Sequence, residues 1–173
     1  MDATPETMAT LQRRFPEVTH SQFRGQTRVW VQRDAMMELF TALKQELSFD
    51  LLVDITCVDY LHYRGATHRF GMVYLLACTE SGERLTVRVP LDEPDLTVPS
   101  LVSLWAGANW LEREVWDLFG VRFKGHPDLR RIVLPEAFTA HPLRKDYPLQ
   151  GRGERHNFPI VRRGSSESNK LNP

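Results

Sequence analysis

Apolar residues in the first fifty positions recur at both helical and strand spacing, which predicts a mixture of helices and strands. Residues 6–15 are predicted to form a short helix. Two strand-forming runs, 18–23 and 27–31, flank Gly25-Gln26 and are typical of a β-hairpin. Asp34 is placed to cap a second helix, whose apolar residues recur at helical spacing. These residues are Met36, Phe40, Leu43 and Leu47.

Two alternating patterns and one continuous apolar run in the next forty residues predict three strands. Residues 70–78 are almost entirely apolar and predict a central strand. After a turn at Ser81-Gly82, residues 85–89 alternate and predict its antiparallel partner. Cys57 and Cys78 fall in predicted strands and are interpreted as small core residues. The first strand carries apolar side chains at every second position: Phe49, Leu51, Val53, Ile55 and Cys57.

The pattern after Pro94 predicts two further helices. The first is short, covers Val98–Trp105 and begins near Pro99. The second is capped by Asn109, with Glu112 at the third helical position in an arrangement similar to a capping box. Gly120 stands where a left-handed residue ends a helix. Together with the strands, these helices predict an α+β fold, in which a mixed, mostly antiparallel sheet carries helices on one side.

The character of the sequence changes after residue 134. Prolines and glycines recur and neither helical nor strand spacing is sustained, yet apolar residues stay spaced through the segment. Disordered tails are poorer in apolar residues, so residues 135–163 are interpreted as an extended irregular arm that wraps a partner. Residues 1–134 are assigned to one globular α+β domain, and residues 164–173 to a disordered tail.

The charge is balanced overall but divided along the chain. The sequence holds 22 Lys and Arg against 22 Asp and Glu, and a net charge of zero gives no general attraction to nucleic acid or anionic lipid. Residues 1–120 carry 11 basic and 17 acidic residues, whereas residues 121–173 carry 11 basic and 5 acidic. The basic C-terminal part is therefore expected to meet an acidic partner, to fold back on its own domain, or to form a solvated tail.

The sequence lacks the usual signs of a redox or nucleotide site. Its two cysteines are too few for an iron–sulfur cluster, and neither they nor the six histidines show the spacing of a metal site. No glycine-rich phosphate loop, nucleophile elbow or signal peptide is expected. The longest apolar run, Phe70–Cys78, is far shorter than the roughly 20 residues of a membrane span. We therefore expect a soluble chain without catalytic, cofactor-binding or metal-binding residues of its own.

Charged and aromatic residues are unusually dense between Trp110 and Val121. On a helix, Arg113 and Asp117 lie four residues apart and are placed to pair. Taken alone, the segment is typical of an amphipathic helix with a solvated charged face. Two further runs alter this interpretation: G-H-P-D-L-R-R-I-V-L at residues 125–134 and P-L-R-K-D-Y-P-L at residues 142–149.

These runs resemble the thirty-kilodalton subunit family of complex I, which comprises the C-type subunits of NADH-quinone oxidoreductases in their stand-alone form. The pattern E-R-E-x-x-D-L-F, then six residues, then H-x-x-x-R-x-I-V matches the family signature at every defined position. The matched residues are Glu112, Arg113, Glu114, Asp117, Leu118, Phe119, His126, Arg130, Ile132 and Val133. The similarity spans about residues 99–161, and its second run adds Arg131 and the P-L-R-K-D-Y-P-L block.

The resemblance implies a subunit of the peripheral arm of a proton-translocating NADH:quinone oxidoreductase, a translocase of the respiratory chain. It implies that NADH, FMN, the iron–sulfur clusters and quinone (ubiquinone) are bound by other subunits, and that this chain works as an obligate hetero-oligomer. Its expected neighbours are the quinone-site subunit, of the forty-nine-kilodalton type, and the small iron–sulfur subunit. The expected location is the cytoplasmic face of the bacterial inner membrane, with membrane contact only through the complex.

Two groups of residues are expected to make the structural contacts of such a subunit. A compact charged triplet is expected to pair with the partner, the alternative being a solvated turn between two prolines. This triplet is Arg144, Lys145 and Asp146, between the apolar Leu143 and Tyr147. The charged signature residues are expected to make buried contacts that join their helix to the arm or the partner. These residues are Glu112, Arg113, Glu114 and Asp117.

Three other functions are considered. The signature is shared widely, so the equivalent subunit of a ferredoxin-dependent or hydrogenase-type membrane complex is the alternative, although residues 152–158 favour bacterial NADH-linked members. A stand-alone enzyme would use His126 or His141 as a base. A nucleic-acid-binding module is disfavoured, because the basic arm has neither a basic helix nor an aromatic-studded sheet.

Overall fold

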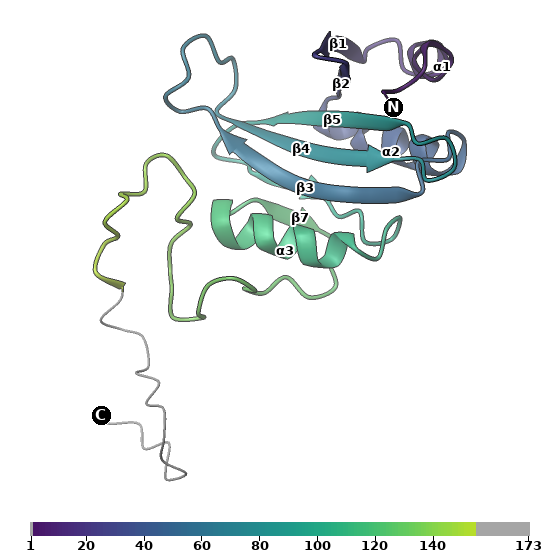
Figure 1. Ribbon diagram of the computed structural model, residues 1–173. Helices are drawn as coiled ribbons and strands as arrows, with labels where there is room; N and C mark the ends of the chain where they lie inside the picture. Colours follow the sequence, from purple (N-terminus) through teal and green to yellow (C-terminus); the bar gives the residue numbers. More distant parts are fainter. Residues whose placement is uncertain (1, 155–173) are drawn as a thin grey trace.

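A computed structural model describes residues 2–154 of the 173-residue chain (Figure 1). The elements are α1 (Pro5–Arg14), β1 (Thr19–Phe23), β2 (Gln26–Trp30), the 3₁₀ helix η1 (Arg33–Ala35), α2 (Met36–Gln45), β3 (Leu51–Asp59), β4 (Phe70–Ala77), β5 (Arg84–Leu91), β6 (Thr97–Pro99), α3 (Ala108–Phe119) and β7 (Arg122–Lys124). The predictions for residues 155–163 of the arm and for the tail of residues 164–173 lie outside the described residues.

A five-stranded sheet forms the centre of the fold, in the order β1-β2-β5-β4-β3. Its neighbouring strands are antiparallel, except for β2 and β5, which are parallel. Strands β6 and β7 form a separate parallel pair. The sheet is therefore mixed and mostly antiparallel, as the sequence predicts, and the hairpin β1–β2 and the antiparallel pair β4–β5 are confirmed.

The core lies between one face of the sheet and helices α2 and α3. Tyr74 of β4 is fully buried there, with its hydroxyl 3.9 Å from the Met36 sulfur of α2 and its ring edge-on to Phe40. Phe40 also contacts Trp105, which precedes α3, and α3 packs against β3 (Figure 1). Both helices thus cover the face that carries Tyr74, which confirms the predicted arrangement. The two cysteines are buried and free.

Strand β3 departs from the predicted alternation. The sequence places Leu51 and Val53 on the buried face, but their side chains are 45% and 49% exposed, whereas Leu52 is buried. A register shift between Leu52 and Asp54 leaves Val53 as an extra residue opposite β4. Such a β-bulge exchanges the two faces of a strand. The prediction is therefore wrong for Leu51 and Val53, whereas the other predicted positions are buried: Phe49, Ile55 and Cys57.

The helix predicted over residues 98–105 does not form. Val98 lies in β6, opposite Phe123 of β7. Only a single turn follows, in which the N–H groups of Leu104 and Trp105 donate to the Leu101 carbonyl at 2.9 Å. Strand β6 pairs with a strand that lies beyond α3 in the sequence, so local spacing carries no sign of it.

Two predicted helix N-caps are wrong, whereas the predicted C-cap is confirmed. Helix α2 begins at Met36 after the 3₁₀ turn that contains Asp34, and no side chain caps it. Helix α3 begins at Ala108, so Asn109 lies inside the helix rather than at its cap. Gly120 ends α3 in the left-handed conformation, with φ of +82°. The end of α3 is thus specified by a local residue, whereas its start depends on tertiary contacts.

Candidate functional site

Glu112, the first residue of the signature, is fully buried near the start of α3. Its carboxylate accepts hydrogen bonds from the Ser100 hydroxyl at 2.7 Å and from the Leu101 N–H at 2.6 Å. Burial raises the pKa of Glu112 to about 7, although both hydrogen bonds favour the charged form. Glu112 therefore joins α3 to the turn after β6, and not to the arm.

Asp117, in the second half of α3, is also fully buried and organises the chain after β7. Its Oδ2 accepts three successive backbone N–H groups, while Oδ1 pairs with the Arg131 guanidinium. The backbone donors are Ile132 at 3.0 Å, Val133 at 2.9 Å and Leu134 at 2.9 Å. Burial acts to raise the pKa of Asp117, but these donors outweigh burial and hold the pKa below its ordinary value.

Two arginines extend the contact between α3 and the chain beside it. The predicted pair between Arg113 and Asp117 does not form. Arg113 donates instead to the carbonyls of Arg130 at 3.1 Å and Arg131 at 3.2 Å. The Arg131 guanidinium reaches both Asp117 and the Ala140 carbonyl, the latter at 3.2 Å. The polar contacts of Arg113 and Asp117 join the helix to residues 130–134 of the same chain, which precede the arm. The expected contact of these two residues with the arm or a partner stays a prediction.

Residues 141–144 of the arm cap the last turn of α3. A helix leaves its final carbonyls without partners, and a cation near them is favoured by the helix dipole. The arm supplies one donor to each of the last three carbonyls of α3, of which that of Asp117 also accepts from Arg131 at 3.3 Å. These bonds run from His141 Nδ1 to Asp117 at 2.9 Å, from the Leu143 N–H to Leu118 at 3.1 Å, and from Arg144 Nε to Phe119 at 2.8 Å.

Gly120 and His141 pack directly against each other. A Cβ at position 120 would lie 2.7 Å from His141 Cδ2 and 2.8 Å from its Nε2. Glycine is thus required both by the positive φ and by the imidazole ring. Burial lowers the pKa of His141, and the charges of Arg131 and Arg144 act in the same direction. At neutral pH the ring is therefore held neutral, with its Nδ1–H donating to the Asp117 carbonyl.

An ion-pair network joins the charged triplet to the body. Arg69, which lies just before β4, bonds to Glu93 at 2.7 Å and to Asp146 at 2.9 Å. Arg144 reaches Glu93 at 3.2 Å. The hydrogen bond from Arg69 lowers the pKa of Asp146. Two side chains of the triplet thus engage their own chain, whereas the side chain of Lys145 is exposed and the expected contact with a partner stays a prediction.

The other signature residues are divided between surface and core. Phe119 is buried and Leu118 is half-buried. Arg130 is exposed and pairs with Asp128 at 2.9 Å. His126 Nε2 donates to the Asn109 carbonyl at 3.1 Å, which ties the turn after β7 to α3. Glu114 is exposed, so the buried contact expected for it is not made within the described part of the chain.

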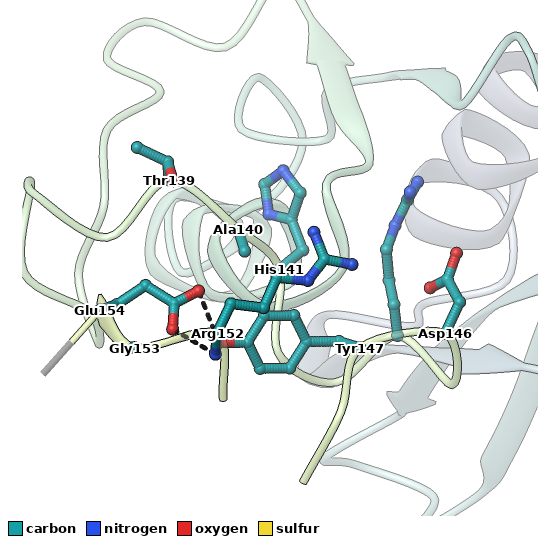
Figure 2. Close-up of a pocket in the computed structure, with 9 residues that line it drawn as sticks. Thr139, Ala140, His141, Asp146, Tyr147, Arg152, Gly153 and Glu154 are labelled. Carbon is teal, nitrogen blue, oxygen red and sulfur yellow. Dashed lines mark hydrogen bonds between the residues drawn. The ribbon is translucent and has the colours of Figure 1, made fainter. Parts of the chain in front are cut away.

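A groove of about 490 Å³ opens along the arm (Figure 2). Figure 2 shows Glu154 turned toward Tyr147 and Arg152. The Tyr147 hydroxyl donates to Glu154 at 2.8 Å, and the Arg152 N–H donates to the same carboxylate at 2.7 Å. These bonds close the turn of residues 147–154 on itself. The lining residues are Thr139, Ala140, His141, Arg144, Asp146, Tyr147, Arg152, Gly153 and Glu154.

Residues 2–154 hold no group of three or more His, Cys, Asp or Glu side chains that could bind a metal ion. Within the same range, no helix is long and apolar enough to cross a membrane. The charged signature residues bond mainly to backbone groups of their own chain, as the contacts of Glu112, Arg113 and Asp117 show. What the site does chemically is to join α3 to the segments on either side of it.

A family profile described as "Respiratory-chain NADH dehydrogenase, 30 Kd subunit" matches residues 29–153. The chain belongs to this family. The matched range runs from β2 through the sheet, α3 and the contacts of the arm. The resemblance carried by the signature is thereby confirmed, and the chain is a thirty-kilodalton-type subunit of an NADH-quinone oxidoreductase.

Curated members of the thirty-kilodalton subunit family are similar over most of the chain. The C-type subunit of the NADH-quinone oxidoreductase of Trichlorobacter lovleyi is 48% identical over 132 residues, which are 76% of this chain and 80% of that protein. The protein of the same name from Moorella thermoacetica is 43% identical over 143 residues, 83% of this chain and 94% of that one. The chain therefore matches relatives of about its own length.

Two solved structures share the fold of the thirty-kilodalton subunit family. The trypsin-resistant fragment (1-134) of Nqo5 is 34% identical, with a TM-score of 0.67 over 73% of this chain and all of that one. A chain of the membrane-bound sulfane sulfur reductase, an archaeal respiratory membrane complex, is 22% identical, with a TM-score of 0.71 over 96% of this chain and 97% of that one. The second likeness shows the fold alone.

Several residues that build the site are not predicted from the sequence. Asp59 accepts the N–H of Lys145 at 2.8 Å across 86 residues, and no local pattern links the two. One signal is present, because Asp59 continues the buried positions Ile55 and Cys57 of β3, and a carboxylate at a core position requires a partner. The other unpredicted members are Arg69, Glu93 and Ser100, together with His141 as a cap.

Proposed function

We propose that the chain is a non-catalytic structural and assembly subunit in the peripheral arm of a proton-translocating NADH:quinone oxidoreductase. The proposal rests on one observation, which is where the polar signature residues lie and what they bind. Glu112, Arg113 and Asp117 are buried and bonded to their own chain. A catalytic residue has to reach a substrate, whereas these side chains hold a helix and the segments beside it together.

Helix α3 is held at both ends, as expected for a subunit that keeps neighbouring subunits in place. Electron transfer between centres depends on fixed distances, so a rigid element contributes without touching a substrate. Glu112 fixes the start of α3, while Asp117 and the caps from residues 141–144 fix its end. In this role the chain packs against the quinone-site subunit of the forty-nine-kilodalton type and the small iron–sulfur subunit. NADH, FMN, the clusters and quinone are then bound by those and other subunits.

The proposal places the chain at the cytoplasmic face of the bacterial inner membrane, held there by the complex. The family and the names of the relatives support membership of an NADH-quinone oxidoreductase. The exposed Lys145 side chain and the arm beyond it supply the proposed contacts with the partner subunits. The division into a body of residues 1–134 and an arm of residues 135–163 belongs to the same proposal.

A test that separates a structural from a catalytic role uses the complex itself. A strain that lacks the native copy is complemented with a tagged chain carrying Asp117→Asn, which removes the buried negative charge opposite Arg131. We expect the amount of assembled complex to fall several-fold, while NADH:quinone turnover per assembled complex stays within about twofold. Asp128→Asn is the matched control, because this carboxylate is 55% exposed and its one ion pair among residues 2–154 is with Arg130.

Two results would contradict the proposal. Normal assembly with lost turnover in Asp117→Asn would assign the residue to the reaction. A wild-type chain that does not co-purify with the quinone-site subunit would remove the assembly role. The alternative, an equivalent subunit of a ferredoxin-dependent or hydrogenase-type membrane complex, predicts that mass spectrometry of the purified complex finds different electron-input subunits.

A further inference from the structure

Three large apolar side chains are exposed together on the side of α3 away from the sheet. Trp110 is 61% exposed, Val133 57% and Ile132 38%. The chain that follows β7 passes along this side of the helix (Figure 1). Arg113, one turn after Trp110, bonds to the carbonyls of residues 130 and 131, which brings this segment beside Trp110. Exposed large apolar side chains on one helix and on the segment beside it are typical of an interaction site.

Buried polar contacts hold these side chains in their exposed positions. Asp117 draws the backbone N–H groups of Ile132 and Val133 toward α3, and their side chains are left facing solvent. The Arg113 guanidinium lies 5.0 Å from the centroid of the Trp110 ring and holds the ring by a cation–π contact. Apolar groups fixed before binding lose little conformational entropy on binding, which makes them effective anchors.

An unpaired carboxylate lies beside these apolar residues. Glu114 follows Trp110 by four residues, so the two side chains are neighbours on the exposed face of α3. Among residues 2–154, no hydrogen bond or ion pair involves the Glu114 carboxylate. The nearby cations are engaged elsewhere, since Arg113 bonds to backbone carbonyls and Arg131 to Asp117. A negative charge at the rim of an apolar patch selects a partner with a cation opposite it.

We propose that Trp110, Glu114, Ile132 and Val133 form a docking face, the α3 docking face, for another subunit of the complex. The partner surface presents an apolar pocket that receives Trp110 and Val133, with a Lys or Arg side chain at its rim opposite Glu114. The inference deepens the proposed function and rests on it. The signature segment thus has two roles. Its buried carboxylates hold the backbone of the segments beside α3, and its exposed apolar residues contact the partner.

The test measures how much of the complex the tagged full-length chain recovers from native membranes. The double variant Trp110→Ala/Val133→Ser removes two exposed anchors, and we expect recovery of the complex to fall about tenfold or more. Glu114→Lys is expected to lower recovery as well, because it places like charges opposite each other. The matched control is Leu51→Ser/Val53→Ser, which removes two side chains of similar exposure from β3. Thermal unfolding of each purified chain checks that the fold is kept.

Each result decides between defined outcomes. Full recovery with the double variant, or an equal loss with the control, overturns the α3 docking face and leaves the proposed function intact. A wild-type chain that recovers no other subunit removes the proposed function itself. Light scattering of the isolated chain tests whether a second copy of this chain binds the α3 docking face instead. A dimer that Trp110→Ala dissociates would assign the face to that second copy and overturn the inference.

Discussion

Two buried carboxylates on the same helix have opposite pKa shifts, and the number and kind of their donors explain the difference. Glu112 accepts one hydroxyl and one backbone N–H, and burial raises its pKa to about 7. Asp117 accepts three backbone N–H groups and a guanidinium, and its pKa is lowered despite burial. Burial alone therefore does not set the charge of a group in this protein.

Glu112→Gln tests the raised pKa through the pH dependence of stability. The folded-state pKa lies above that of the unfolded chain, so deprotonation costs folding free energy as pH rises from about 4.5 to about 7. Glutamine carries no such titration. We expect wild-type stability to fall relative to the variant across this window, by up to about 3 kcal/mol, and the difference to be constant above it. Urea denaturation at a series of pH values measures this.

The control for Glu112→Gln is Glu114→Gln on the same helix. Glu114 is exposed, so its substitution shows whether the loss of one charge on α3 is enough to produce the effect. A difference between wild type and Glu112→Gln that does not change with pH would show that burial does not perturb Glu112. His141 titrates in an overlapping range with the opposite sign, since its lowered pKa costs stability as pH falls. Comparing each variant with wild type cancels that contribution.

At the scale of the element, α3 shows what hydrophobic spacing can and cannot reveal. The amphipathic pattern of residues 110–121 and Gly120 predict a helix that ends at residue 119, and it does. This pattern does not predict the donors to the carbonyls of the last turn, which are His141, Leu143 and Arg144 of the arm. The helix is thus predictable as an element, whereas its capping is a property of the tertiary fold.

Gly120→Ala tests the contact between α3 and the arm. An alanine Cβ is strained at φ of +82° and would lie within 2.8 Å of two atoms of the His141 ring, which therefore has to move. We expect a loss of about 1–3 kcal/mol in the free energy of unfolding, together with faster proteolysis of the arm. Gly107→Ala is the matched control, because a Cβ there meets nothing within 4 Å and φ is −62°. Equal stability and equal proteolysis of the two variants would contradict the prediction.

The sheet shows the same division between local and tertiary information. Strands β3 and β5 follow from alternation, β4 follows from a continuous apolar run, and the turn between residues 77 and 84 joins β4 to β5. The parallel pairs β2–β5 and β6–β7 join segments separated by whole elements, so no local spacing encodes them. The bulge at Val53 cannot be predicted from the sequence either, because an inserted residue leaves the composition of the strand unchanged. Of the site, the signature locates α3 and its buried carboxylates, but not Asp59, Arg69 or His141.

On the scale of the whole molecule, the basic C-terminal part folds back on the acidic body over the residues that the structure describes. Of the expected outcomes, this is the one seen for residues 131–146. The individual pairs do not follow the overall charge, however. Arg131 and Arg144 meet Asp117 and Glu93 as expected, whereas the acidic Asp146 of the arm meets the basic Arg69 of the body. Net charge predicts the direction of attraction but not its geometry.

A double-mutant cycle on Arg69 and Asp146 measures this contact between arm and body. Arg69→Gln, Asp146→Asn and the double variant are expected to give a coupling free energy of about 0.5–1 kcal/mol, which decreases as salt is added. Arg69 is 19% exposed and Asp146 47%, so the pair is only partly screened by solvent.

The control cycle uses Arg33 and Asp95, a pair 2.6 Å apart that lies within the body. We expect urea denaturation to detect a coupling free energy in both cycles. Only the variants of Arg69 and Asp146 are expected to change the rate at which a protease cleaves the arm. Zero coupling for Arg69 and Asp146, or equal effects of both pairs on cleavage, would show that this ion pair does not hold the arm.

The capping of α3 by the arm has a consequence for how the protein is made. Phe119 and its donor Arg144 are 25 residues apart, and a ribosome adds roughly 5–20 residues per second. Synthesis of the donors of the last turn therefore follows synthesis of the turn itself by about one to five seconds, although a helix forms within about a microsecond. During that interval the nascent chain carries carbonyls without their final partners, so translation rather than helix formation sets when this part of the molecule is complete.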